Sequence, residues 1–404
     1  MSLPLANIRV LDLSRALSGP FCSMILGDLG ADVVKVEPTP DGEMIRGWGP
    51  FHDGIGVFFL SVNRNKRSLA VDFRRREGIA LIRELALEAD VLVENFKPGS
   101  TAAMGLDYAS LQDFNPKLVY ASITGFGASG PYGTWPGFDQ IAQGMSGLMS
   151  LSGFPDGEPT RVGLPIGDML AGMWTAIGVN AALAARHVSG RGQQVDTSLL
   201  AGLVGMLCVQ GQRYLSLEEV PQRAGNDHPV IFPYGAFTAA DAPINLAAPT
   251  QPMWASVCRV LGLEELVDHP DFHDNSARAA NREALRARMN EQLRTRPAMD
   301  WSRELIAAGI PAGPIYTLDQ VFADAQVQHC GMVETVQHPV IGALRQLSSP
   351  IRMQGMEHGA VRFAPPLLGQ HSRDVLAEYG LDAARIDALL RDGIVATAAG
   401  KTSP

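Results

Sequence analysis

Several familiar signatures are missing from this chain of 404 residues. Its four cysteines form no C-x-x-C pair, so the sequence indicates neither a disulfide framework nor a thiolate zinc site, and we expect buried free thiols in a reducing cytoplasm. The nine histidines include no H-E-x-x-H motif, and the pair His269 and His273 falls in a segment rich in proline and aspartate. A G-x-S-x-G motif is also lacking. We therefore expect no bound metal and no serine-hydrolase chemistry.

Positive charge is scarce, and the formal net charge is −9. This balance argues against a broad nucleic-acid-binding surface. The first residues lack the basic and apolar regions of a signal peptide, and glycine, aspartate or arginine interrupts the apolar stretches, so no membrane span is expected. An anionic ligand would need a local cluster of cations. Residues 63–67 and 74–76 are such clusters, and each fits either a solvated surface or a phosphate site.

The first 125 residues alternate strand-like and helix-like segments. Short β-rich runs are followed by apolar segments with helical periodicity, of which residues 77–89 are the clearest. This alternation predicts an α/β fold with a doubly wound, Rossmann-like parallel sheet. Ligands on such sheets bind beyond the carboxyl ends of the strands. The expected strands are residues 8–13, 32–37, 68–72, 90–94 and 118–124.

The chain is too long for one typical core, so we expect two domains. Long helices are predicted near residues 168–187 and 197–217, and a polar stretch at 218–233 then breaks the pattern. The residues that follow predict a smaller α+β domain. We therefore expect a large domain from residues 1–220, a small domain from residues 226–325, and a return of residues 330–404 to the large domain.

One aspartate, Asp168, lies at the boundary between a loop-like segment and an apolar, alanine-rich helix. A carboxylate there can accept backbone N–H groups and is stabilised by the helix dipole. Gly167 and Gly172 remove side-chain bulk on both sides, so a large ligand could approach. A lone aspartate at a helix start is most often a cap, and this interpretation stays open beside a catalytic one.

The G-x-G-x-x-G motif at residues 125–130 follows the last predicted strand, yet it does not fit a dinucleotide site. Pro131 comes directly after the third glycine, so no helix N-terminus is expected to face a pyrophosphate there. The acidic residue that would contact a ribose about 20 residues later is missing as well. We expect this motif to have no role in nicotinamide binding.

The order and spacing of several short motifs resemble the family III CoA-transferases, of the CaiB/BaiF and formyl-CoA transferase type. The resemblance runs from Ile8 to about Tyr379, and it depends on the whole set rather than on any single motif. The motifs are residues 10–20, 29–38, 65–68, 94–99, 124–127, 167–168 and 190–193, with 223–226 and 368–371 extending the likeness.

The resemblance implies a large Rossmann-like domain built from both ends of the chain, a smaller domain between them, and two chains threaded through each other as an interlocked homodimer. It also implies coenzyme A and acyl-CoA as substrates, with no permanently bound cofactor. Asp168 would attack the acyl-CoA thioester to form a mixed anhydride and then an aspartyl-CoA thioester, from which a carboxylic acid takes the CoA. Succinyl-CoA or another dicarboxylyl-CoA is the donor expected from the family.

The family's functional residues can be carried over by position. Racemases of the family have Gly-His-Asp where this chain has Gly137-Phe138-Asp139, and Phe138 cannot take up a proton, which favours a transferase over the alternative of an α-methylacyl-CoA racemase. A non-catalytic acyl-CoA-binding protein is a second alternative.

The resemblance also implies which residues contact the ligand. The CoA contacts fall on Arg15, Ala16, Leu17 and Ser18, on Lys66 and Arg67 near the adenosine phosphates, and on Asn95, Phe96 and Lys97. The substrate pocket falls on Phe138, Asp139 and Gly167.

Overall fold

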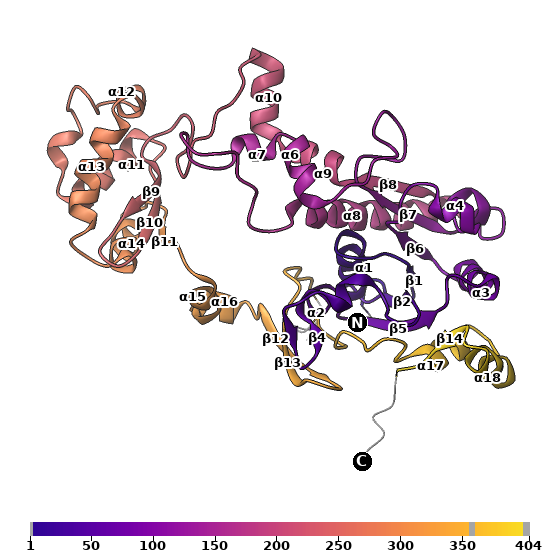
Figure 1. Ribbon diagram of the computed structural model, residues 1–404. Coiled ribbons are helices and arrows are strands. Elements are labelled where there is room, and N and C mark those ends of the chain that lie inside the picture. The colour runs from indigo at the N-terminus through magenta and orange to yellow at the C-terminus, as the bar shows by residue number, and fades with distance from the viewer. Residues whose placement is uncertain (1–2, 355–359, 399–404) are drawn as a thin grey trace. The chain divides into compact units, whose positions relative to one another are not determined.

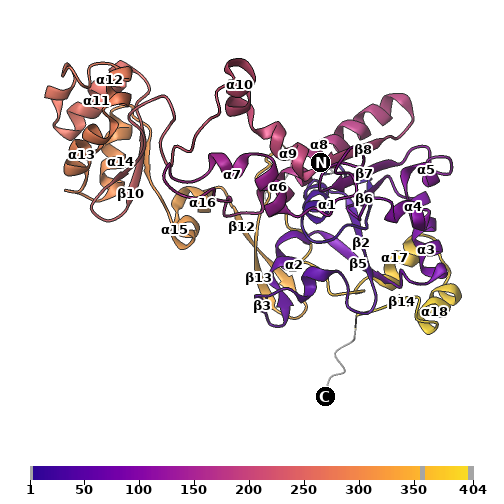
Figure 2. The same cartoon turned by 45° about the horizontal axis from the view of Figure 1, so that its top comes forward.

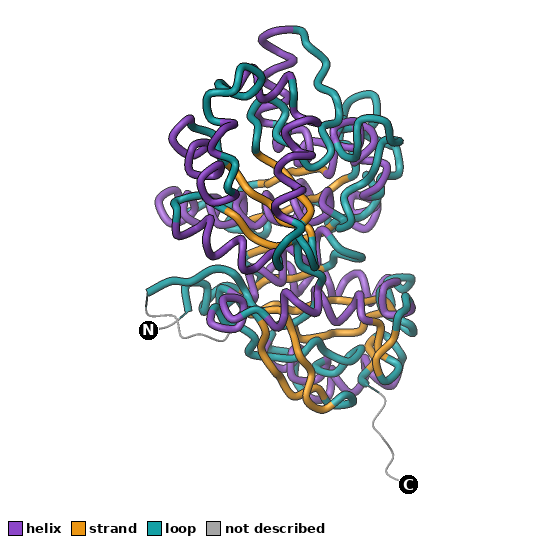
Figure 3. Tube along the Cα trace, turned by 90° about the vertical axis from the view of Figure 1, so that its left-hand side faces the viewer, coloured by secondary structure: helices purple, strands orange, loops and turns teal. Residues whose placement is uncertain are grey.

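A computed structural model of the chain describes residues 3–354 and 360–398. It divides into two compact units, a large one formed by residues 1–148, 161–218 and 326–404 and a smaller one formed by residues 149–160 and 219–325. Figure 3 distinguishes the helices, strands and loops of the chain by colour.

A seven-stranded sheet forms the centre of the large unit, in the order β14-β5-β2-β1-β6-β7-β8 (Figure 1). Neighbouring strands are parallel except at one edge, where β14 runs antiparallel to β5. The mixed α/β class with a large parallel sheet is thus confirmed. The strands are β1 (Arg9–Asp12), β2 (Asp32–Pro38), β5 (Lys66–Val71), β6 (Val91–Glu94), β7 (Val119–Thr124), β8 (Gln194–Ser198) and β14 (Val395–Ala396).

Helices cover both faces of this sheet, because successive side chains of a strand point to opposite faces. On β1, Val10 packs with apolar residues of α1 and α8, whereas Leu11 packs with those of α3, α17 and α18. Figure 2 shows these helices around the sheet. The longest helix, α8, has the length and composition that could cross a membrane, and it packs on α1, β7 and β8. These helices are α1 (Ser18–Asp28), α3 (Arg76–Leu87), α8 (Ile166–Ser189), α17 (Ser372–Glu378) and α18 (Ala383–Arg391).

The smaller unit has its own core. Its three-stranded antiparallel sheet has the order β11-β10-β9, and buried side chains such as Trp254 and Met289 pack its helices against the strands. The elements are β9 (Tyr234–Thr238), β10 (Pro243–Ala247), β11 (Ala312–Pro314), α11 (Gln251–Leu261), α12 (Asn275–Ala280), α13 (Arg282–Leu293), α14 (Ala298–Ala307) and α15 (Leu318–Ala323).

Shorter elements connect these layers. They are β3 (Phe51–His52), β4 (Ile55–Gly56), α2 (Val57–Val62), α4 (Ser100–Met104), α5 (Tyr108–Leu111), α6 (Asp139–Met145), α7 (Leu148–Leu151), α9 (Leu199–Met206), α10 (Cys208–Leu217), α16 (Ala325–His329), β12 (Val333–His338) and β13 (Gly342–Leu347), with 3-10 turns at Met44–Gly47 and Glu264–Leu266.

Two segments differ from the sequence-based expectation. The helix predicted over residues 197–217 is instead the end of β8 followed by α9 and α10, with a break at Cys208, whose φ is 37°. Residues 149–160, assigned from sequence to the large domain, belong to the smaller unit. The Gly225 N–H donates to the Gly153 carbonyl at 3.0 Å, and the Arg223 guanidinium donates to the Phe154 carbonyl at 3.1 Å, so this segment is bonded to the start of the smaller unit.

Candidate active site

The carboxyl ends of β1 and β6 lie side by side, and the chain winds away from them in opposite directions, through β2 and β5 on one side and β7 and β8 on the other. Such a switch point is where open parallel sheets bind ligands. Asn95, directly after β6, joins the two loops: its side chain accepts from the Arg15 N–H and donates to the Arg15 carbonyl, both at 2.8 Å. It also donates to the Ser18 hydroxyl at 3.3 Å. Two of the predicted groups of CoA contacts therefore meet here.

Asp168 is the third residue of α8 and is half-buried. It is not the N-cap, which is Pro165, so the alternative interpretation of Asp168 as a capping residue is wrong. Its carboxylate receives a hydrogen bond from the Ser18 side chain. Helices α1 and α8 approach so closely here that a Cβ on Gly172 would lie 2.5 Å from the Ser18 carbonyl oxygen, which only glycine avoids.

Pro165 occupies the N-cap position without a side-chain hydrogen bond, and the side chain that caps α8 instead belongs to Asp139 of α6. Its Oδ1 accepts from the N–H of Gly167 at 2.7 Å and from that of Asp168 at 3.4 Å. Its Oδ2 accepts from the Gln143 amide at 2.7 Å, and Gln143 in turn accepts from the Val162 N–H at 2.9 Å. The buried Asp139 therefore fixes the start of α8 and brings a second carboxylate next to Asp168.

These surroundings change the acidity of Asp168. Burial raises its pKa, the nearby charge of Asp139 raises it further, and the hydrogen bond from Ser18 opposes both, with a resulting pKa of about 7. A carboxylate with a pKa near neutrality is a stronger base and nucleophile than an ordinary aspartate, and it still ionises at physiological pH. A perturbed pKa in such a location is typical of functional residues.

Phe138 precedes α6 and is 62% exposed. Its position is set by a contact between two glycines, because a Cβ on Gly137 would lie 2.5 Å from the Gly125 Cα. The Thr124 hydroxyl accepts from the Gly127 N–H at 2.8 Å. In this part of the structure, Gly125 allows close backbone packing, whereas Gly127 and Gly130 have positive φ angles of 108° and 82°. The segment precedes no helix before α6, in agreement with the prediction from sequence.

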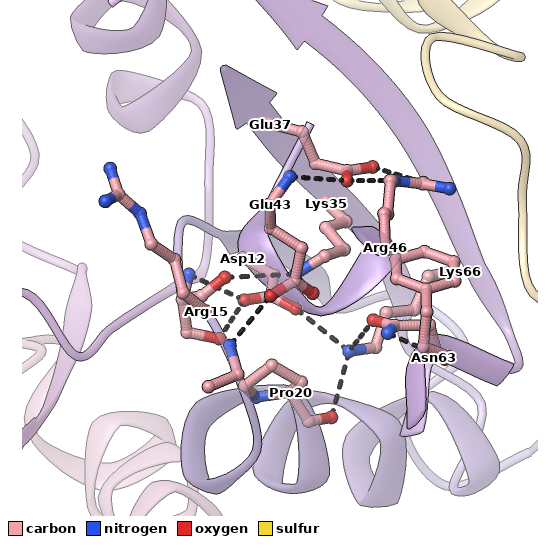
Figure 4. Close-up of polar contacts among 12 residues, drawn as sticks. Asp12, Arg15, Pro20, Lys35, Glu37, Glu43, Arg46, Asn63 and Lys66 are labelled. Carbon is pink, nitrogen blue, oxygen red and sulfur yellow. Dashed lines mark hydrogen bonds and ion pairs between the residues drawn. The ribbon is translucent and has the colours of Figure 1, made fainter. Parts of the chain in front are cut away.

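Lys66 and Arg67 are not where the family resemblance placed them. The Lys66 ammonium is fully buried and donates to Asp12 at 3.1 Å and to the Pro20 carbonyl and the Asn63 side chain at 2.9 Å (Figure 4). Burial lowers its pKa to about 8, although Asp12 opposes this shift. Both residues begin β5 and so lie towards the amino edge of the sheet.

The side chain of Arg67 is also occupied. Its guanidinium pairs with Asp32 at 2.6 Å and with Glu378 at 2.7 Å. We therefore correct the expectation that Lys66 and Arg67 meet the adenosine phosphates: Lys66 is an interior cation, and Arg67 is paired at the edge opposite the switch point.

Arg74, from the second cation cluster, lies just beyond the carboxyl end of β5, and its side chain is 74% exposed and pairs with Asp72 at 2.8 Å. The preceding Phe73 ring is 6.5 Å from the Phe96 ring, over which the Arg15 guanidinium lies at 4.5 Å. Arg15 Nε is buried and unpartnered within the described part of the chain. Arg74 is thus an exposed cation at the carboxyl edge of the sheet, whereas Lys66 and Arg67 begin the strand at the opposite edge. The position of each cluster before or after the strand was the signal that could have separated them.

Lys97 completes this edge of the sheet. Its side chain is exposed and forms no ion pair within residues 3–354 and 360–398. A cationic and aromatic surface thus lies beside a half-buried carboxylate of raised pKa, at the switch point of a parallel sheet. The arrangement is typical of α/β proteins that bind an anionic, nucleotide-like ligand at the switch point of a parallel sheet.

Comparison with known families agrees with this class. Residues 5–372 match the family model described as CoA-transferase family III. The chain belongs to this family and is a CoA-transferase, so the family and the enzyme class predicted from sequence are confirmed.

Relatives with established names resemble nearly the whole chain. Succinyl-CoA:glutarate CoA-transferase of Mus musculus is 38% identical over 394 residues, covering 97% of this chain and 90% of the mouse protein. Succinate–glutarate CoA-transferase of Agrobacterium fabrum is 39% identical, covering 93% of this chain and 95% of that protein. A crystal structure of a CaiB/BaiF family protein from Brucella suis superimposes with a TM-score of 0.85 at 39% identity, covering 94% of this chain and all of that one (100%).

Proposed function

We propose that this CoA-transferase moves CoA from a dicarboxylyl-CoA, such as succinyl-CoA, to a dicarboxylic acid, through covalent intermediates on Asp168. The observation that carries the mechanism is the half-buried Asp168 carboxylate, with a pKa of about 7, at the switch-point edge of the sheet. The substrate class follows from similarity to enzymes named for succinyl-CoA and glutarate.

The reaction proceeds by two exchanges at the Asp168 carboxylate. One carboxylate oxygen attacks the thioester carbonyl, the carbon–sulfur bond breaks, and the CoA thiolate leaves a mixed anhydride. The thiolate then attacks the Asp168 carbonyl carbon, which releases the donor acid and forms an aspartyl-CoA thioester. An acceptor carboxylate repeats both steps in reverse order, which forms the new acyl-CoA and regenerates Asp168.

The groups around Asp168 are suited to these steps. The N–H groups of Ser18 and Gly19, the first two residues of α1, have no preceding helical carbonyl to bond, so they can donate to the oxyanion of a tetrahedral intermediate. Asp139 keeps the backbone of Gly167 and Asp168 in place. The exposed Phe138 ring provides an apolar wall for the acyl chain or the pantetheine.

For the rest of CoA we propose a path across the loops that follow β1 and β6. Arg15, Ala16, Leu17 and Ser18 contribute the first loop, and Asn95, Phe96 and Lys97 contribute the second. Arg74 replaces Lys66 and Arg67 as the cation nearest the adenosine phosphates, because it is exposed and lies at the carboxyl edge.

The active form is proposed to be an interlocked homodimer. Support comes from apolar side chains that α9 and α10 leave exposed, among them Val204, Met206, Val209 and Leu215. Large apolar side chains exposed along two successive helices are expected where a partner subunit covers them. A cytoplasmic location is also proposed, on the basis of the four free cysteines.

The proposed function is tested by incubating the purified protein with succinyl-CoA or acetyl-CoA and a panel of carboxylic acids that includes glutarate, with mass spectrometry of the CoA products. Transfer should be fastest between dicarboxylates. Hydroxylamine added during turnover should modify Asp168, and Asp168→Asn and Asp168→Ala should abolish transfer. Substantial activity in either variant would contradict the assignment of the nucleophile.

A further inference from the structure

The loop between β1 and α1 has a backbone conformation that its sequence does not favour. Ala16 has a φ of 59°, in the left-handed region where the Cβ of an ordinary residue crowds the following carbonyl. Side chains from other segments hold this turn. The Ala16 N–H donates to the Glu43 carboxylate at 2.7 Å, and the Ser14 carbonyl accepts from the Lys35 ammonium at 3.0 Å. On the other side, Asn95 bonds both main-chain groups of Arg15.

Glu43 and Lys35 form a buried ion pair beneath the loop. Lys35 Nζ and Glu43 Oε1 are 2.9 Å apart, and their side chains are 0% and 1% exposed. The Glu43 backbone N–H donates to Glu37 at 3.4 Å, and Glu37 is itself held by Arg46 at 2.6 and 2.7 Å (Figure 4). The Glu43 carboxylate is therefore fixed in the protein before any ligand arrives.

The turn at Ala16 determines where the functional groups on either side of it lie. Arg15 extends away from the buried cluster (Figure 4). Its guanidinium lies over the Phe96 ring. Ser18 begins α1, and its side chain bonds Asp168. If the turn relaxed to an ordinary backbone conformation, both residues would move relative to Asp168.

We propose that Glu43 is a positioning residue of this enzyme: its carboxylate, paired with Lys35, holds the loop after β1 in the left-handed turn that directs Arg15 towards CoA and Ser18 towards Asp168. The proposal rests on the proposed function for the identity of the ligand. Glu43 acts through the loop and does not touch the substrate.

A matched control is available at the other end of α1. Asp28 and Arg64 form a second buried ion pair, with 2.6 Å between Arg64 Nη2 and Asp28 Oδ2 and side-chain exposures of 5% for Arg64 and 3% for Asp28. Asp28 also accepts from Asn65 at 2.8 Å, and the described structure shows no contact from it to the loop after β1. Asp28→Asn therefore disrupts a comparable buried pair without loosening the turn.

The test compares Glu43→Gln with Asp28→Asn. Glutamine keeps one oxygen for the Ala16 N–H, but it then turns two amide hydrogens towards the Lys35 ammonium, so it cannot satisfy both partners. Calorimetric titration with CoA should show a weaker Kd for Glu43→Gln and a Kd near that of the wild type for Asp28→Asn. With succinyl-CoA and glutarate, kcat/KM for the CoA ester should fall about 10- to 100-fold in Glu43→Gln, as expected when reacting groups are misplaced.

If Glu43→Gln does not fold, Glu43→Asp gives the same answer. Its carboxylate keeps the charge opposite Lys35 but is one methylene too short to reach Ala16 as well, so CoA binding should weaken in a variant that still folds. Unchanged CoA affinity in the Glu43 variants, or an equal loss in Asp28→Asn, would overturn the proposal. Absence of transfer by the wild type would refute the proposed function instead, and the comparison of CoA affinities would still decide the role of Glu43.

Discussion

Replacing Asp168 with asparagine should stabilise the fold while it abolishes transfer. In the folded protein the carboxylate is half-buried beside Asp139, and its pKa is raised from 3.8 to about 7. Above neutral pH the wild-type protein therefore carries a charge that its own structure disfavours. Asparagine has the same shape, can still accept from Ser18, and bears no charge, so it removes this penalty.

The size and the sign of the effect follow from the pKa. The pKa of Asp168 in the folded protein is about 3 above its ordinary value. At 1.36 kcal/mol for each pKa unit, the ionised carboxylate lowers the free energy of unfolding by at most about 4 kcal/mol. Below pH 4, Asp168 is protonated in both the folded and the unfolded states, and the variant gains nothing. Between pH 4 and 7 the folded state holds more protons than the unfolded state, so wild-type stability falls as the pH rises. The advantage of Asp168→Asn grows over this window and is constant above it.

Denaturant unfolding of both proteins at pH 4.5 and pH 8, together with transfer assays, measures this effect. Asp113→Asn, at an exposed aspartate of the same unit, is the control and should show no gain that depends on pH. If the stability advantage of Asp168→Asn is the same at the two pH values, or if the variant is less stable at pH 8, the electrostatic account of Asp168 is refuted.

Four further outcomes are expected. Asp139→Asn should move the acidic limb of the kcat/KM profile to lower pH, because it removes the charge that raises the pKa of Asp168. The amide oxygen of the variant can still accept from the Gly167 N–H at the start of α8. An unmoved limb would show that burial alone raises the pKa of Asp168. Arg74→Ala should raise the KM for CoA esters at low salt, with a smaller effect at high salt, and an unchanged KM would make Arg74 a purely solvated residue. Light scattering should give twice 43.2 kDa even at high dilution, and a monomer that appears on dilution would contradict threading. Incubation with a chiral 2-methylacyl-CoA in D₂O should leave the α-carbon free of deuterium because Phe138 cannot carry a proton, whereas incorporation would support a racemase.

The sequence predicts the large unit well because its elements have clear apolar periodicity. Strands β1, β2 and β5 to β7 lie within a few residues of the predicted ranges. Strand β8 was missed because it lies at an edge of the sheet, where only Ser198 is buried and the short run is largely polar. The start of α8 was predicted from the change between a loop-like segment and an apolar, alanine-rich one, whereas its capping side chain, Asp139, comes from another helix and could not be read from local sequence.

Buried charges were the least predictable part of the site. In a sequence, Lys66 and Arg74 look alike, as members of two basic clusters near the same strand. What distinguishes them is non-local: Asp12 on β1 reaches the Lys66 ammonium, whereas Arg74 lies beyond the strand end and is exposed. Lys35 is buried for a similar reason, since Glu43 pairs with it across a turn. Charge patterns therefore predict an anion site without showing which cations line it.

The pairing of β14 with β5 bears on the order in which the chain can fold during synthesis. Val395 and Ala396 complete the edge of the sheet against Val71 and Ala70, and α17 and α18 cover one face. Until those residues leave the ribosome, β5 remains an open edge, with apolar side chains available to other nascent chains. The smaller unit ends near residue 325 and is complete much earlier. The unit whose synthesis starts first is thus the last to be finished, and a truncation before residue 372 would leave it open and prone to aggregate.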